Sequence, residues 1–136
     1  MRNGTIGLVS AISLFLSFSA AAGTNWISLG STNDGLKWEG KPGSFEFTTT
    51  KNKAAVALIA GRVVNSKTSD IQLYKWYVSV ADCNNNMGKL VSLSVGGEYE
   101  FDSDFMFGSG NVSSSIAEFI CAVADDSIKK ASGKSL

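Results

Sequence analysis

The 136-residue chain contains no histidine, and this absence bears first on catalysis and on metal binding. Histidine is the side chain most often used for general acid–base catalysis, and a nucleophilic serine or cysteine needs such a base beside it. Histidine is also the commonest metal ligand in proteins. We therefore predict a protein that is not an enzyme and that uses no metal and no cofactor.

Clusters of positive charge are also missing. The chain has 12 lysines and arginines against 12 aspartates and glutamates, and the basic residues form no stripe along the sequence. Because nucleic-acid binding is driven by clustered lysine and arginine side chains that release counterions, we predict no nucleic-acid partner. A single proline and 10% aromatic residues favour a folded domain over a disordered chain.

A long apolar stretch occurs only at the N-terminus. Arg2 precedes a mostly apolar run over residues 6–18, and Ser19-Ala20-Ala21-Ala22 leads to Gly23. This order predicts a secretory signal peptide over residues 1–22 with an Ala-x-Ala cleavage site. The alternative is an uncleaved anchor, although the apolar run is shorter than the roughly 20 residues that a spanning helix needs. We expect a periplasmic, secreted or cell-surface protein with no stable membrane insertion after cleavage.

The two cysteines, Cys83 and Cys121, both follow the predicted signal peptide. Two thiols in an exported chain are far more often paired than free. A redox or metal pair is disfavoured because there is no Cys-x-x-Cys spacing. We predict a Cys83–Cys121 disulfide that adds about 4 kcal/mol to the free energy of unfolding through loop entropy. It would brace a single exported domain over residues 23–125, followed by a polar, flexible tail over residues 126–136.

Alternating apolar and polar residues predict β-strands over residues 26–30, 36–40, 44–50, 71–83, 89–95 and 98–107. Gly96-Gly97 predicts a hairpin turn between the last two strands. Residues 54–64 are apolar on both faces, which is typical of a covered strand, although the small residues also suit a helix. In the last strand, alternation predicts that Tyr99, Phe101, Phe105 and Phe107 point inward, with Phe101, Phe105 and Trp76 in the core.

The apolar spacing changes to a helical period after residue 111. Val112, Ile116, Phe119, Ile120 and Val123 form one stripe, and Ser115 with Glu118 three residues later fits a capping box. The predicted helix ends at residue 125 and carries Cys121. The fold class is therefore α+β: a small antiparallel β-sheet or partly open barrel with a C-terminal helix that is tied by one disulfide.

The segment DCNNNMGK, residues 82–89, places Asp82, Asn84 and Asn86 at alternate positions, as a calcium-binding loop does. Such a loop needs glycine at its sixth position and glutamate at its twelfth, and this chain has Met87 and Leu93 there. Asparagine and glycine both tolerate left-handed backbone. We therefore interpret the segment as a turn after a strand, not as a metal site.

The order of several residues resembles the surface-adhesin protein E family of Gram-negative bacteria. The shared features are a tryptophan after the signal peptide, an Asp-Cys pair at a strand end, a glycine-bearing turn and a final helix with Cys-Ala. The residues that carry this resemblance are Trp26, Trp76, Asp82, Cys83, Gly88 and Cys121. The resemblance implies adhesion to host extracellular proteins, and hence a binding function.

Five residues are candidates for contact with a partner. Alternation places four carboxylates on one outward face, with neighbours two residues apart separated by roughly 7 Å. That spacing is within the range of paired glycosidase carboxylates, but we favour a solvated surface or a contact face for a basic partner. Trp38 lies between Lys37 and Glu39 and is either an exposed interface anchor or a lid over one end of the core. The five candidates are Trp38, Glu98, Glu100, Asp102 and Asp104.

Two binding functions follow from these observations. The first is an exported, non-enzymatic protein, adhesin-like, that acts as a surface or periplasmic interaction module of a Gram-negative bacterium. The alternative is a periplasmic inhibitor or immunity protein that blocks a cell-wall hydrolase, since an acidic face suits a cationic target. A protein partner is expected in both cases.

Overall fold

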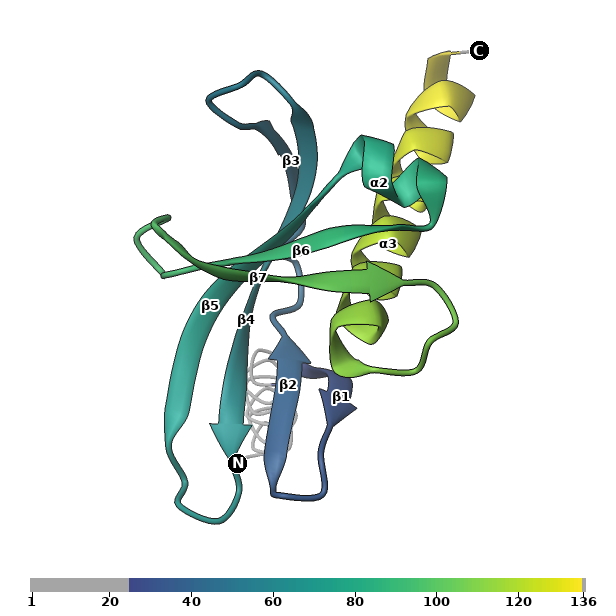
Figure 1. The fold of residues 1–136 in the computed structure, drawn as a ribbon. Coiled ribbons are helices and arrows are strands. Elements are labelled where there is room, and N and C mark those ends of the chain that lie inside the picture. The colour runs from purple at the N-terminus through teal and green to yellow at the C-terminus, as the bar shows by residue number, and fades with distance from the viewer. Residues whose placement is uncertain (1–24, 136) are drawn as a thin grey trace, which may run out of the picture.

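The computed structural model describes residues 25–135, so the predicted signal peptide over residues 1–22 lies outside the described part of the chain. Strands dominate the first two thirds of this part, and a long helix closes it (Figure 1). The elements are β1 (Ile27–Ser31), β2 (Leu36–Gly40), β3 (Glu46–Thr49), β4 (Ala55–Asn65), β5 (Ile71–Ser79), α2 (Val80–Asn85), β6 (Met87–Leu93), β7 (Tyr99–Met106) and α3 (Val112–Ser135).

The strands form one open antiparallel sheet in the order β1-β2-β4-β5-β6-β7. β4 organises it, because one half of this strand pairs with β2, the other half pairs with β3, and its other edge pairs with β5. The segment over residues 54–64, for which a helix was an alternative, is therefore a central strand. The predicted α+β fold class is confirmed: an open antiparallel sheet, a C-terminal helix and one disulfide.

We call the face of the sheet that α3 covers the inner face. α3 contacts β1, β4, β5, β6 and β7. Its apolar stripe packs into a core of aliphatic and aromatic side chains, in which a fully buried valine, leucine, isoleucine or phenylalanine contributes about 1.5–3 kcal/mol. The core residues from the sheet are Leu29, Ala57, Ile59, Trp76, Val78, Leu90 and Phe105, and those from α3 are Ile116, Ala117, Ile120, Cys121 and Ala124.

Both ends of α3 differ from the sequence prediction. Asn111 caps the helix, because its Oδ1 accepts a hydrogen bond from the Ser114 backbone N–H at 2.8 Å, whereas Ser115 lies inside the first turn. The helix does not end at residue 125 but continues to Ser135. Two i,i+4 ion pairs, Asp125–Lys129 and Asp126–Lys130, each at 3.0 Å, stabilise this exposed extension.

The strand predicted to run to Cys83 ends at Ser79 and is followed by the short helix α2. Ser79 is its N-cap, since the Ser79 hydroxyl accepts a hydrogen bond from the Asp82 N–H at 3.0 Å. Asn86 ends the helix with a φ of 61°. The prediction of a simple turn was wrong because the serine cap competes successfully with continuation of the strand.

The prediction that the aromatic residues of the last strand point inward was only partly correct. Phe105 is buried and Phe107 packs against the core, but Tyr99 is 63% exposed and Phe101 is 49% exposed. The register explains this result: Ser92 pairs with Phe101 and Leu93 pairs with Tyr99, so Glu100 lies in a bulge. A bulge adds one residue to one strand and reverses the alternation beyond it. Tyr99 therefore lies on the outer face, and Phe101 lies on the inner face beyond the helix.

Candidate functional site

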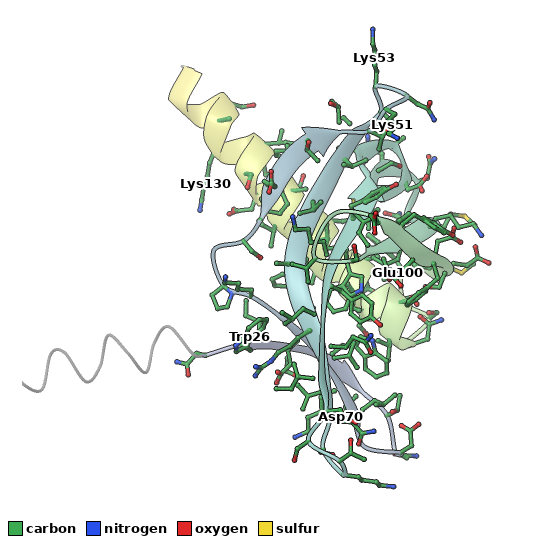
Figure 2. The ribbon with its side chains drawn as sticks, turned by 90° about the vertical axis from the view of Figure 1, so that its left-hand side faces the viewer. Trp26, Lys51, Lys53, Asp70, Glu100 and Lys130 are labelled. Carbon is green, nitrogen blue, oxygen red and sulfur yellow. A yellow bond between two sulfur atoms is a disulfide. The ribbon has the colours of Figure 1, made fainter. Side chains whose placement is uncertain are left out.

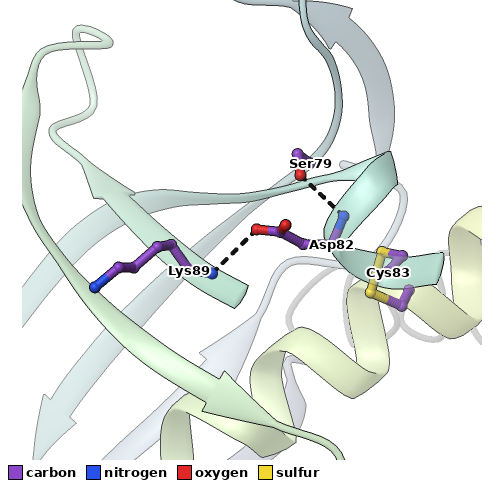
Figure 3. Close-up of a disulfide and its surroundings, with 5 residues drawn as sticks. Ser79, Asp82, Cys83 and Lys89 are labelled. Carbon is purple, nitrogen blue, oxygen red and sulfur yellow. Dashed lines mark hydrogen bonds between the residues drawn. A yellow bond between two sulfur atoms is a disulfide. The ribbon is translucent and has the colours of Figure 1, made fainter. Parts of the chain in front are cut away.

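The predicted disulfide is present and joins α2 to α3. The Cα atoms of Cys83 and Cys121 are 5.5 Å apart, and Figure 3 shows the bridge between the two helices. α3 is thereby fixed to the end of β5, which carries Trp76 at its centre.

Asp82 and Gly88, two residues of the family-like pattern, form a brace beside this disulfide. The Asp82 carboxylate accepts a hydrogen bond from the Lys89 backbone N–H at 3.1 Å (Figure 3). A Cβ atom at position 88 would collide with the same carboxylate, so only glycine fits there. The Asp-Cys and Gly positions thus connect α2 to the start of β6, and their observed contacts are structural.

Beyond the region covered by α3, the inner face contains a cavity of about 570 Å³. The first turns of α3 close one side of it through Val112, Ser113 and Ile116, and the sheet forms the rest. Pockets of roughly 300–1,000 Å³ lined by apolar side chains and a few polar groups are typical of small-molecule sites. The sheet contributes Leu36, Trp38, Val63, Asn65, Asp70, Ile71, Gln72, Tyr74, Trp76, Leu90, Ser92, Phe101 and Ser103.

Aromatic rings dominate the cavity wall. The Tyr74 and Trp76 rings are stacked with centroids 6.0 Å apart, and Phe101 meets Tyr74 edge to face at 6.1 Å. Trp76 can lie flat across β4 because position 61 is glycine, where a Cβ would collide with the indole ring and would lie 2.6 Å from the Glu39 carbonyl oxygen. The sequence therefore places a rigid aromatic floor at this point of the sheet.

Trp38 belongs to the same cavity. Its side chain is half-buried, contacts the core cluster and lines the cavity wall opposite β7. Of the two roles predicted for it, this position resembles the lid over one end of the core. Trp38 and the four acidic candidates lie in different places, because the carboxylates line the turn before β7 and the exposed side of that strand.

Ser92 is the cavity residue that the sequence analysis missed. It is 2% exposed and lines the cavity, and within residues 25–135 its hydroxyl makes no hydrogen bond. The other buried serine, Ser114, bonds to the Met106 N–H and to the Ser109 hydroxyl at 3.0 and 2.7 Å. Leaving a buried hydroxyl without a partner costs about 1–3 kcal/mol. Ser92 is therefore a buried hydroxyl at the cavity wall that has no partner within the described residues.

The acidic candidates occupy the hairpin formed by β6 and β7, residues 87–106, which we call the β6–β7 hairpin. All four are exposed. Glu98 lies in the turn and Glu100 in the bulge, while Asp102 and Asp104 flank Lys89 on the outer face. The Lys89 ammonium lies 2.6 Å from Asp104 and 3.8 Å from Asp102. The bulge therefore breaks the single acidic face that alternation predicted. Asp102 and Asp104 share the outer face and are partly neutralised by Lys89, whereas Glu98 and Glu100 lie at and beyond the bulge and are not.

Two pKa shifts report this arrangement. The hydrogen bond and the charge of Asp104 raise the pKa of Lys89 above its ordinary value. The Tyr99 hydroxyl donates to Asp102 at 2.6 Å, which raises the pKa of Tyr99 because deprotonation would break the bond and create a second negative charge. Tyr99 is therefore held as a neutral donor on the outer face.

Large exposed apolar side chains gather on the same hairpin. Of the large hydrophobic residues that are exposed within the described part of the chain, more lie here than on all other elements together. Three of them lie among the carboxylates on β7, which has no further strand beside it, one lies in the turn and one lies on β6. The residues are Met87, Val95, Tyr99, Phe101 and Met106.

No family model, curated protein or solved structure matches this chain. The resemblance to the surface-adhesin protein E family therefore stays a prediction. In the region from residue 25 to residue 135, no helix is long and apolar enough to cross a membrane.

Proposed function

We propose that this chain is an exported, non-enzymatic binding protein, an adhesin-like interaction module at the surface or in the periplasm of a Gram-negative bacterium, and that its protein partner binds the β6–β7 hairpin. The observation that carries the proposal is the concentration of exposed apolar side chains along this hairpin. Tyrosine, phenylalanine and methionine are enriched at protein interfaces.

The charges of the hairpin favour a basic partner. Glu98 and Glu100 form no ion pair within residues 25–135, so both carboxylates are available to a cation on another molecule. Charges at the rim of an interface mainly accelerate association and select partners. The partner surface that fits combines an apolar centre with lysine or arginine at its edge.

The disulfide supports export. Disulfides form and persist in oxidising compartments and are rare in the reducing cytosol. Cys83 and Cys121 are bonded, and there is no free cysteine among the described residues. The predicted signal peptide, cleavage and the periplasmic or surface location rest on this support together with the sequence of residues 1–22.

The test is binding of the oxidised, secreted protein to purified host extracellular-matrix proteins by surface plasmon resonance. The variant Tyr99→Ser with Met106→Ser removes two exposed apolar side chains from the hairpin. We expect it to weaken binding by about tenfold or more, as loss of interface anchors does. The matched control is Leu73→Ser, because Leu73 is also an exposed apolar residue but lies on β5.

Charge is tested by Glu98→Gln with Glu100→Gln, which should slow association and reduce the effect of salt on it. Glu46→Gln on β3 is the control, because it removes an exposed carboxylate elsewhere. Equal loss of binding in hairpin variants and controls, or no binding to any matrix protein, would count against the proposal.

The alternative is a periplasmic inhibitor or immunity protein that blocks a cell-wall hydrolase, and the unpaired Glu98 and Glu100 favour it. In that case the same sensor surface would capture a cationic hydrolase and inhibit its activity. Capture would fall with salt and with the two glutamine substitutions, and the matrix proteins would not bind.

A further inference from the structure

A second binding site is separate from the β6–β7 protein interface. We propose that the cavity on the inner face binds an uncharged sugar ring, held between Trp38 and the aromatic floor and hydrogen-bonded by Ser92. The inference does not depend on the proposed function, because a protein partner would contact the outer face and the turn of the hairpin, whereas the small ligand would contact the inner face. Phe101 is the one exposed apolar residue of the hairpin that also lines the cavity.

The cavity is preformed and not a gap left by poor packing. Gly61 admits the Trp76 ring, Tyr74 stacks on that ring, and Phe101 meets Tyr74 at its edge. Trp76 itself is 2% exposed, so the floor is anchored in the core. A volume of about 570 Å³ remains above this fixed floor, which is enough for a small ligand.

Charge excludes several ligand classes. The lining contains no lysine and no arginine, and its one acidic side chain is Asp70. Lys51 and Lys53 lie at the opposite end of the molecule from Asp70 (Figure 2), and Lys67 in the turn before Asp70 is not among the lining residues. A phosphate or carboxylate ligand would therefore meet a carboxylate and no cation. The site suits a neutral molecule.

The polar side chains of the lining indicate which class of neutral molecule fits the cavity. Ser92 is a buried lining residue whose hydroxyl has no hydrogen-bond partner within residues 25–135, and Asn65, Gln72 and Asp70 add amide and carboxylate groups to the lining. These groups donate and accept hydrogen bonds around apolar rings. A sugar ring matches both features, because its C–H face packs on an aromatic ring while its hydroxyls bond to the polar groups at the edge.

The test is titration of the oxidised, secreted protein with neutral monosaccharides and their disaccharides: glucose, galactose and N-acetylglucosamine. Tryptophan fluorescence and saturation-transfer NMR report binding. We expect saturable binding in the millimolar range or tighter by at least one of these sugars. Trp38→Ala should weaken it by about tenfold or more, and Ser92→Ala by about threefold to tenfold, the value of one hydrogen bond.

Trp26→Phe is the matched control, because Trp26 is stacked on Arg62, with 4.2 Å from the guanidinium carbon to the ring centroid, and does not line the cavity. It should leave sugar affinity unchanged within twofold. Near-ultraviolet circular dichroism checks that each variant is folded. If Trp38→Ala fails to fold, Ser92→Ala alone decides, because it removes one oxygen atom.

Three outcomes would overturn the inference. The first is no saturable binding by any of the sugars. The second is equal weakening by Trp26→Phe and by the cavity variants. The third is binding of indole or phenol, flat rings without a set of hydroxyls, in the absence of sugar binding, which would make the cavity a purely apolar site.

Discussion

The inner face of the sheet has two halves that share strands but differ in what covers them. In the closed half, α3 seals Ala57, Ile59 and Val78 under Ile116 and Ile120. In the open half, beyond the first turns of the helix, side chains of β2, β4, β5, β6 and β7 surround a cavity. The difference shows that the placement of α3, which the disulfide ties to the end of β5, decides where the inner face is closed and where a cavity remains.

Two serines represent the two halves. Ser114 is fully buried beside the start of α3 and has two hydrogen-bond partners, whereas Ser92 is 2% exposed and has none within the described residues. A buried polar group that is bonded contributes to stability, and one that is not bonded costs stability. The hydroxyl of Ser114 is thus hydrogen-bonded within the protein, and the hydroxyl of Ser92 is not.

The largest effect is expected when the anchor of the closed half is removed. Replacement of both cysteines, Cys83→Ser with Cys121→Ser, opens a loop with a sequence separation of 38 residues. Loop entropy predicts a loss of about 4 kcal/mol in the free energy of unfolding, measured by urea denaturation. The reduced wild-type protein is the control and should show the same loss. Unchanged stability would mean that α3 is positioned by packing alone.

The next effect compares apolar truncations in the two halves. Ile120→Ala empties a fully buried position under α3 and should cost about 2–5 kcal/mol. Leu36→Ala, in the half-buried cavity wall, should cost less than half of that amount, since its side chain already borders open space. Both are measured by chemical denaturation. Equal losses would show that the cavity wall is packed like the closed half.

The smallest effect lies outside both halves, on the outer face. Because the hydrogen bond to Asp102 raises the pKa of Tyr99 above 10.0, this bond contributes to stability below that pH and its contribution is lost as the pH rises through the folded-state pKa. Asp102→Asn should return the Tyr99 titration, followed by tyrosinate absorbance, toward the ordinary value, with almost no change in the melting temperature. If the Tyr99 titration does not change, the hydrogen bond to Asp102 is not the cause of the raised pKa. Asp104→Asn is the control.

Much of the fold was predictable because its signals are local. Period-two alternation predicted most of the strands, the four-three spacing after residue 111 predicted the final helix, and two cysteines in a chain with a predicted signal peptide predicted the disulfide. The errors are equally local in origin. Ser79 starts a helix where alternation continued the strand, and the bulge at Glu100 reverses the face of Tyr99.

The candidate site was predicted less well, because a cavity depends on which face a distant helix covers. The sequence indicated Trp38 but gave no reason to join it to Tyr74, Phe101 and Ser92, which come from three other strands. In residues 89–95 the alternation grouped Val91 and Leu93, yet the buried side carries Leu90 and Ser92. Apolar alternation therefore placed Ser92 on the wrong face of the strand.

The most direct test of the contrast between the halves is the free energy of unfolding of Ser92→Ala beside that of Ser114→Ala. The account predicts that Ser114→Ala loses about 1–3 kcal/mol, because the Met106 N–H and the Ser109 hydroxyl lose a partner. It predicts that Ser92→Ala is unchanged or up to about 1 kcal/mol more stable, because no protein partner is lost. A loss at Ser92 as large as that at Ser114 would contradict the account, since it would show that the Ser92 hydroxyl has a hydrogen-bond partner within the protein.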